Sequence, residues 1–149
     1  MQTALQLLQA LLDTMARKPV ATHELFAEDG VYEAPYLESL GVPWRFRGRA
    51  EVAEHLDEVR ELFPELTFHD FVIVADTPEC VVAEYQFTTR SSRTGRMIHQ
   101  LIVGRLEAAD GKIVLLRESL NLMELALALY RRGLADDRIP SDREGWPDS

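Results

Sequence analysis

The chain has 149 residues, of which 46% are hydrophobic and 28% are charged, a balance typical of a globular protein with one sizeable core. We therefore expect a single domain over residues 1–149. The net charge of −9 argues against nucleic acid and anionic membrane as partners, because both bind basic surfaces.

The N-terminal segment, residues 2–18, predicts an amphipathic helix that ends at Pro19. Its apolar residues recur at steps of three and four: Leu5, Leu8, Leu12 and Met15. Because it lacks a basic start and is interrupted by Gln and Asp, we expect neither a signal peptide nor a membrane span. The single cysteine, Cys80, cannot form an internal disulfide, which fits the reducing cytoplasm.

The next segment predicts a short helix at 23–27, a strand at 31–36 and a loop at 37–48. The proline at position 35 indicates a strand end or edge. Aromatic and arginine side chains on the loop suit the rim of a pocket. They also suit a loop that packs its aromatic residues on the nearest helix. We include Tyr36 and Trp44 among the residues expected to line a pocket.

Residues 49–63 predict a second long helix, which Pro64 ends. Its apolar stripe consists of Val52, Leu56, Val59 and Phe63. His55 lies at the edge of this stripe, within one turn of Glu51 and Glu58. It either faces a pocket together with Val59 and Phe63 or belongs to a surface network of charges.

Antiparallel strands are predicted at 66–75 and 80–91, joined by a turn at 77–78. Alternation places two sets of side chains on opposite faces of the second strand: Val81, Ala83, Tyr85 and Phe87 on one face, and Glu84, Gln86, Thr88 and Arg90 on the other. Glu84 could line the cavity or a dimer interface, and we count it among the pocket residues.

Two further strands flank the turn Asp110-Gly111, because apolar, β-branched runs on both sides of a glycine-containing turn indicate a hairpin. His99 lies on the first of them. It could reach the cavity or a dimer interface, since a slip of one residue reverses the face. The run 113–116 is apolar throughout, which is typical of a strand buried on both faces.

Glu118 follows this buried run, and a buried carboxylate has to be paired, protonated or functional. Leu116 and Leu120 share its face and favour the neutral acid, which suits a general acid. The alternative is an ion pair with an arginine, such as Arg105 or Arg117 of a second copy.

After Glu118 the apolar residues Leu122, Leu125, Ala126 and Leu129 predict a helix that ends at Gly133 as its C-terminal cap. A polar tail follows, in which Ile139 and Trp146 are expected to pack on the domain. The element order predicts an α+β fold, with helices on one face of a strongly curved antiparallel sheet. Such a cone encloses a cavity, which is the default ligand site.

This order of elements resembles the nuclear transport factor 2-like superfamily, which includes ketosteroid isomerases and SnoaL-like polyketide cyclases. Four segments, in the same order, are similar to the phenazine biosynthesis A/B proteins: 23–30, 48–64, 110–121 and 143–147. The last of these, with Arg-Glu-Gly-Trp-Pro, adds most to the specificity of the match.

The resemblance implies a cone-shaped α+β barrel that dimerises through its sheet. It also implies acid/base help to imine formation between two aminocyclohexenone carboxylic acids, with the acid at Glu118 and an assisting histidine at His55. Two positions depart from the pattern. Val59 stands where members carry a hydroxyl residue, and Thr22 stands where they carry an arginine. These departures bear on the substrate and leave the acid/base pair intact.

Two classes of function fit the sequence. One is a cofactor-free general acid/base enzyme of secondary metabolism that acts on a small cyclic substrate; the other is a non-catalytic protein that binds a small molecule in the same cavity. We expect no metal and no cofactor, because the four histidines and the one cysteine lack ligand spacing. We expect a homodimer, because a partner's sheet would cover the second face of the run 113–116.

Overall fold

The computed structural model describes residues 1–17 and 21–140. Six strands form one sheet in the order β2-β1-β6-β5-β4-β3. The strands are β1 (Phe26–Glu33), β2 (Arg45–Arg47), β3 (His69–Asp76), β4 (Cys80–Arg90), β5 (Met97–Ala109) and β6 (Lys112–Ser119). The α-helices are α1 (Ala4–Met15), α2 (Arg49–Leu62) and α3 (Leu122–Leu129).

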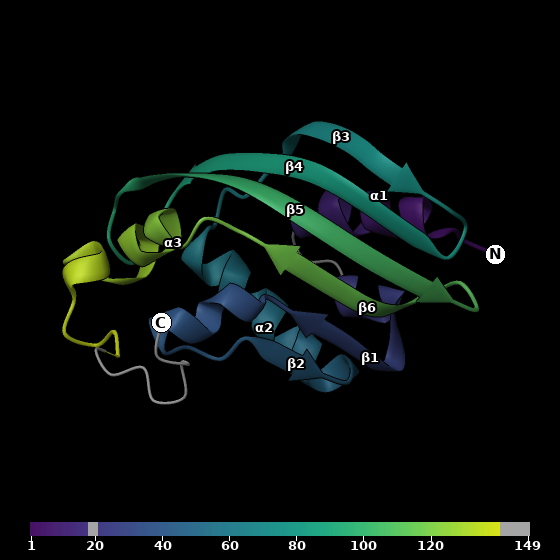
Figure 1. Ribbon diagram of the computed structural model, residues 1–149, viewed down its shortest axis with the longest axis horizontal. Coiled ribbons are helices and arrows are strands. Elements are labelled where there is room, and N and C mark those ends of the chain that lie inside the picture. Colours follow the sequence, from purple (N-terminus) through teal and green to yellow (C-terminus); the bar gives the residue numbers. More distant parts are fainter. Residues whose placement is uncertain (18–20, 141–149) are drawn as a thin grey trace, which may run out of the picture.

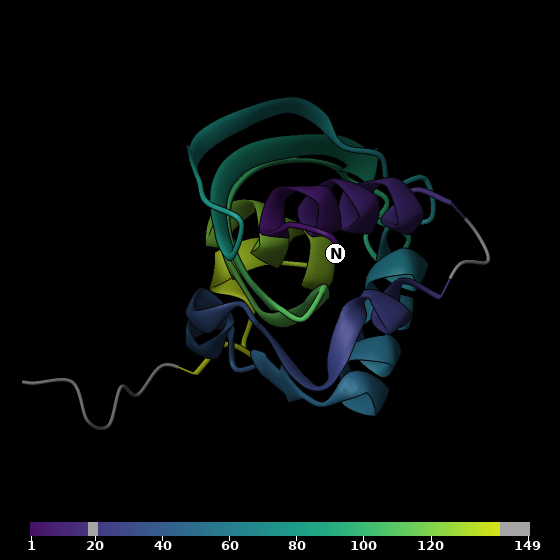
Figure 2. The same ribbon diagram turned by 90° about the vertical axis from the view of Figure 1, so that its right-hand side faces the viewer.

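The sheet is strongly curved, and both long helices lie on its concave side (Figure 2). Helix α1 packs against β4, β5 and β6, whereas α2 packs against β1 and β2. Helix α3 sits at one end of the long strands (Figure 1). The predicted α+β cone is therefore confirmed, and so is the placement of the two long helices on the same side.

The hairpin between β5 and β6 turns at Asp110 and Gly111, whose φ angles of 52° and 71° are those of a two-residue hairpin turn. Strands β4 and β5 pair without a register shift from Cys80↔Glu107 to Arg90↔Met97. This long regular pairing determines which side chains of β4 and β5 point into the cone.

The first strand differs from the prediction. It starts at Phe26 instead of residue 31 and ends at Glu33, because a 3-10 helix begins at Pro35. A second 3-10 helix, Thr22–Leu25, stands where the short helix 23–27 was predicted. β1 pairs in parallel with β6 and in antiparallel with β2, a strand that we predicted as loop. Such pairing joins distant segments, so no local pattern reveals it.

The C-terminal helix also ends earlier than predicted. Its C-cap is Tyr130, and Gly133 instead begins a 3-10 turn, Gly133–Ala135. Ile139 is half-buried and packs on the core, as expected. Pro19, Trp146 and the segment 143–147 lie outside the described residues.

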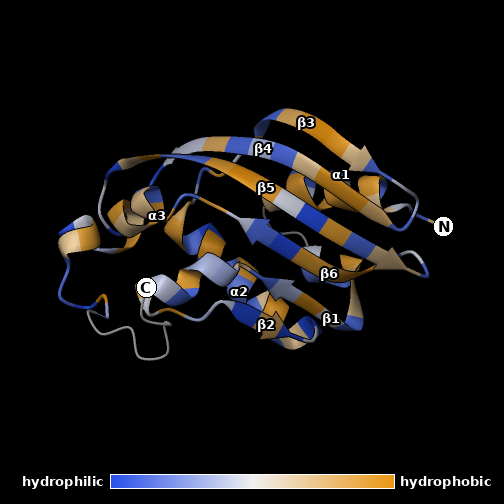
Figure 3. Cartoon of the chain, viewed as in Figure 1, coloured by the Kyte–Doolittle hydropathy of each residue, from blue (hydrophilic) through white to orange (hydrophobic). Residues whose placement is uncertain are grey.

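Figure 3 shows the alternation of polar and apolar residues along the strands. The side chains that point into the cone form the core together with those of α1, and Leu7, Leu8, Ile98, Leu106 and Leu116 are all fully buried. No helix in residues 1–17 and 21–140 is both long and apolar enough to cross a membrane.

Candidate active site

The cone encloses a cavity of about 270 Å³, near the lower end of the range of ligand sites. Most of its walls are apolar side chains from α1, α2, α3 and the long strands. The polar lining residues are few: Tyr32, His55, Glu58, Arg93, Gln100 and Glu118. Such a cavity suits a small, largely apolar molecule that is oriented by a few polar contacts.

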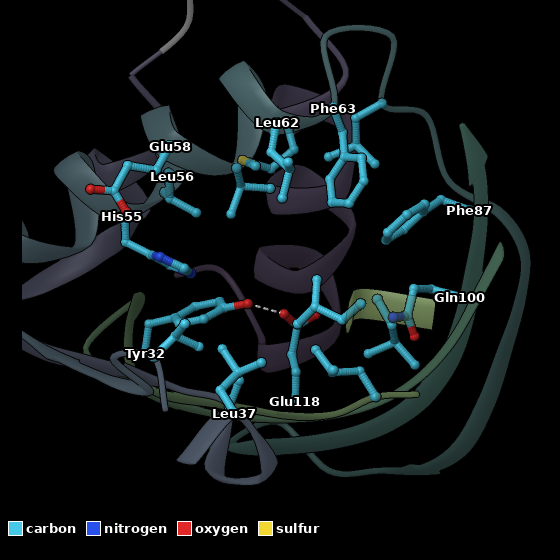
Figure 4. A pocket seen from close by; sticks show the side chains of 18 of the residues that line it. Tyr32, Leu37, His55, Leu56, Glu58, Leu62, Phe63, Phe87, Gln100 and Glu118 are labelled. Carbon is cyan, nitrogen blue, oxygen red and sulfur yellow. Dashed lines mark hydrogen bonds between the residues drawn. The ribbon is translucent and has the colours of Figure 1, made fainter. Parts of the chain in front are cut away.

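Glu118 lies on β6 and points into this cavity (Figure 4). Its side chain faces the interior with those of Leu116 and Leu120, and the residue is only 7% exposed. The hydroxyl of Tyr32 donates a hydrogen bond to Oε1 of Glu118, and the hydroxyl of Tyr85 donates one to Oε2. No arginine in the described part of the chain bonds to this carboxyl group, so the ion-pair alternative is wrong within one chain.

Burial raises the pKa of Glu118 above its ordinary value, and the hydrogen bonds from Tyr32 and Tyr85 only partly oppose this. Burial and the nearby Glu118 also raise the pKa of both tyrosines, so their hydroxyls remain donors. A carboxyl group with a raised pKa that faces a cavity can give a proton to a ligand and take it back.

Gln100 secures the chain directly after this strand. Its side-chain amide donates to the carbonyl of Asn121 at 2.8 Å and accepts from the Asn121 amide at 2.8 Å. The Asn121 side chain in turn caps α3 by accepting from the amides of Met123 and Glu124. The end of β6, and with it Glu118, is thus held in place from two sides.

His55 projects from α2 toward the same cavity (Figure 4). Its ring stacks on Phe46 with 3.8 Å between centroids and an interplanar angle of 10°, and its centroid lies 4.9 Å from that of Tyr32. Burial lowers the pKa of His55 from 6.5 to about 4, so the ring is neutral at pH 7. Because its ring packs on Phe46 and Tyr32, His55 belongs to the wall of the cavity and not to a surface network of charges.

The mouth of the cavity lies between α2, the segment before β2 and the β4–β5 loop. Pro43, Glu58 and Arg93 line the cavity and are also exposed. Glu58 and Arg93 place one negative and one positive charge at the mouth, whereas the interior of the cavity is mostly apolar. Polar groups of a bound molecule would therefore lie either at Glu118, Tyr32 and His55 or at this rim.

The SnoaL-like domain family matches residues 8–116, most of the chain. The chain belongs to this family. The matched region contains the greater part of α1, all of α2, His55 and both tyrosines, and it ends two residues before Glu118. No protein with a curated description matches the sequence.

Crystal structures show the same fold as this SnoaL-like protein. A candidate isomerase from Bacillus subtilis is 25% identical over 84% of this chain and 91% of that one, with a TM-score of 0.75. A phenazine biosynthesis-related protein from Pseudomonas aeruginosa is 23% identical over 97% and 93% of the two chains, with a TM-score of 0.72. The solved structure of an LEH-like epoxide hydrolase from M. tuberculosis is 22% identical over 88% of this chain and 91% of that one, with a TM-score of 0.60.

Val59 and Phe63, on the α2 side of this SnoaL-like cavity, are lining residues. The predictions for Tyr36 and Trp44 were wrong. Tyr36 is 56% exposed because the chain leaves β1 before it and turns into a 3-10 helix, from which Leu37 faces the cavity instead. The ring of Trp44 lies beneath the Arg45 guanidinium at 4.3 Å, and Phe46 lines the cavity in its place.

The predictions for Glu84 and His99 as pocket residues were also wrong. Tyr85 and Gln100 point into the cone, so their neighbours Glu84 and His99 point out of it. His99 bonds to Gln86 at 2.8 Å on this outer face. The sequence pattern described the alternation of faces correctly, and only the pairing in the sheet shows which face is the inner one.

Arg117, which follows the apolar run on β6, pairs with a different carboxylate. It shares the buried Glu33 with Arg45, whose Nε lies 3.0 Å from Oε2 of Glu33. Burial alone would raise the pKa of Glu33, but bonds from Arg117 and Arg45 outweigh it, so the pKa is lowered. The two glutamates that are buried in residues 1–17 and 21–140 therefore differ: Glu33 is held as an anion on the outer face of the sheet, and Glu118 favours the acid on the inner face.

Tyr32 and Tyr85 were not predicted as partners of Glu118. Tyr85 was placed on the apolar face of its strand, and a buried tyrosine usually finds a hydrogen-bond partner for its hydroxyl. The sequence predicted a buried tyrosine at position 85 and a buried carboxyl group at position 118, so this rule could have predicted that they bond to each other. In residues 1–17 and 21–140, no group of three His, Cys, Asp or Glu side chains is arranged to hold a metal ion.

Proposed function

We propose that this SnoaL-like protein is an enzyme of the isomerase or cyclase type that works by general acid/base catalysis on a small cyclic substrate without a cofactor. One observation carries the proposal: the Glu118 carboxyl group faces a largely apolar cavity and is held there by two tyrosine hydroxyls. A structural glutamate in the same sheet, Glu33, instead forms ion pairs with two arginines, Arg45 and Arg117.

The apolar walls favour a neutral ring, and Glu118 is placed to protonate a carbonyl oxygen or an imine nitrogen of that ring. Tyr32 lines the cavity next to Glu118, so its hydroxyl can share charge that develops on the same atom. The neutral ring of His55, beside Tyr32, offers a nitrogen that accepts a proton from a neighbouring carbon. Enolisation, isomerisation and ring closure all need this pair of functions.

Phenazine-type condensation is the finer version of this proposal. Structural likeness to a phenazine biosynthesis-related protein supports it, together with the sequence resemblance to that family around Glu118 and His55. In that reaction Glu118 would protonate the hydroxyl that leaves as water when an amine condenses with a ketone. The B. subtilis candidate isomerase supports the broader class of proton-transfer reactions.

The experiment uses hydrogen exchange, because enolisation, isomerisation and ring closure by Glu118 and His55 all move a proton next to a carbonyl. Cyclic ketones and enones are incubated with the protein in D₂O, and loss of the α-proton signal is followed by NMR. We expect faster exchange than in buffer for at least one ring of a size that fits about 270 Å³. Rings that bind without any enhanced exchange would instead support the alternative, a non-catalytic binding protein.

We also propose a homodimer that forms through the outer face of the sheet. Val72, Leu101 and Val103 are 52%, 45% and 37% exposed there. The register places Val72, Glu84 and Val103 side by side on adjacent strands. A second copy that lays its own outer face on this one would remove the apolar side chains from water.

Sedimentation tests the dimer directly. The mass of one chain is 17.0 kDa, so a dimer should sediment at about twice that value. Replacing Leu101 with Asp should shift the protein toward the monomer, because it places a charge in the apolar part of the face. The matched control is Met123→Asp, an exposed residue on α3. A native protein that sediments as a monomer at micromolar concentration would contradict the proposal.

A further inference from the structure

Tyr85 and Tyr32 hold the same carboxyl group but differ in their access to a ligand. Tyr32 lines the cavity, whereas Tyr85 is fully buried and does not line it. Tyr85 donates to Oε2 of Glu118 from within the core. A role for Tyr85 in any reaction therefore has to act through Glu118.

The path of the Tyr85 side chain crosses the neighbouring strand. Glu118 on β6 pairs with Gly104 on β5, and Gly104 pairs with Ala83 on β4. Tyr85 is the next residue of β4 that points inward, so it reaches Glu118 diagonally across β5. The ring passes directly over Gly104, and this passage is open because Gly104 has no side chain.

A side chain at position 104 would close this passage. A Cβ atom there would lie 2.8 Å from Cε1 and 2.9 Å from Cζ of the Tyr85 ring, closer than Cβ atoms approach other atoms in proteins. The backbone itself does not require glycine, because position 104 is not among those with positive φ. Glycine in a strand interior weakens the strand and marks a close approach, which here is the approach of the Tyr85 ring.

The ring has little freedom to move aside. Phe68 packs edge-on against it at 5.7 Å between centroids, and Phe71 lies nearly parallel to it at 6.4 Å. We propose that Gly104 and Tyr85 are a positioning pair, in which the missing side chain at 104 lets the Tyr85 hydroxyl hold the Glu118 carboxyl group toward the cavity. Only the consequence for catalysis rests on the proposed function, because the pairing exists without a substrate.

Gly104 and Tyr85 together affect how tightly Glu118 holds its proton. A donor at Oε2 stabilises the carboxylate, whereas burial stabilises the acid. With both present the group can release its proton and recover it. Without Tyr85 the carboxyl group should hold its proton more tightly, which makes it a poorer acid and leaves less carboxylate to act as a base.

Infrared spectroscopy tests this on the protein alone. The carbonyl band of protonated Glu118 is identified by its loss in Glu118→Gln and is followed against pH. Gly104→Ala and Tyr85→Phe should each raise the proton affinity of Glu118 by roughly 10-fold or more, the worth of one hydrogen bond to a charged group. The double variant should match Tyr85→Phe. An unchanged proton affinity in folded Gly104→Ala would overturn the proposal, whatever the outcome of the exchange experiment.

A second comparison covers the case in which Gly104→Ala does not fold. The smaller side chain of Tyr85→Leu leaves room for a Cβ at position 104. Gly104→Ala should therefore lower the melting temperature much less in the Tyr85→Leu background than in the native protein. An equal loss in both backgrounds would show that Gly104 is needed for another reason and would overturn the pairing.

Discussion

Replacing Glu118 with Gln should lower turnover by about 10²–10⁴-fold, the usual worth of one general acid. The amide keeps the shape of the side chain and can still hydrogen-bond to Tyr32 and Tyr85, whose hydroxyls can rotate to suit it. It has no proton to transfer. The affinity for a neutral ligand should change little, because the cavity is mostly apolar. Two quantities are measured for the native protein and for Glu118→Gln: the rate of the proton-transfer reaction at saturating substrate, and the ligand affinity by calorimetry.

Stability separates the catalytic role of Glu118 from a structural one. The pKa of Glu118 is raised in the folded protein. The stability that Glu118 contributes to the folded state is therefore fully present below its pKa in the unfolded chain, and it is lost as pH rises through its pKa in the folded protein. Gln carries no charge at any pH. The variant should therefore be as stable as the native protein at neutral pH, or more stable.

The matched control is Glu84→Gln, a carboxylate on the outer face of the same sheet, which should leave turnover unchanged. If Glu118→Gln unfolded the protein while turnover per folded molecule stayed the same, Glu118 would be a structural residue.

The second large effect concerns His55 and the stability of the protein in mild acid. The pKa of His55 falls from 6.5 to about 4 on burial, so the unfolded chain takes up a proton at a pH where the folded protein does not. Its contribution to stability is present above pH 6.5 and is lost as pH falls toward 4. The shift corresponds to about 3 kcal/mol of unfolding free energy.

Urea unfolding between pH 7.5 and 4 measures this loss. His55→Gln should lose less stability over this range than the native protein, by up to about 3 kcal/mol, because Gln does not titrate. Phe46→Leu removes the ring that stacks on His55 and exposes the imidazole to water, so it should reduce the loss only in part. If the native protein and His55→Gln showed the same pH dependence, the ring of His55 would be hydrated in solution.

Elements defined by local signals were predicted well. The stripes of α1 and α2, the Asp110-Gly111 turn and the alternation along β4 all depend on residues a few positions apart, and the structure contains each of them. The boundaries of β1 and the existence of β2 were missed. These strands exist because they pair with β6 and with each other, and neither carries a strong pattern of its own.

By itself, the sequence determined that Glu118 would be buried, because an apolar run leads into it and Leu116 and Leu120 share its face. Only the tertiary structure decided what surrounds that carboxyl group. Tyr32 and Tyr85 are separated from Glu118 by 86 and 33 positions in the chain. The physical reason is that their hydroxyls reach it only through the parallel pairing of β1 with β6 and across the open space at Gly104, and strand pairing depends on contacts along the whole sheet.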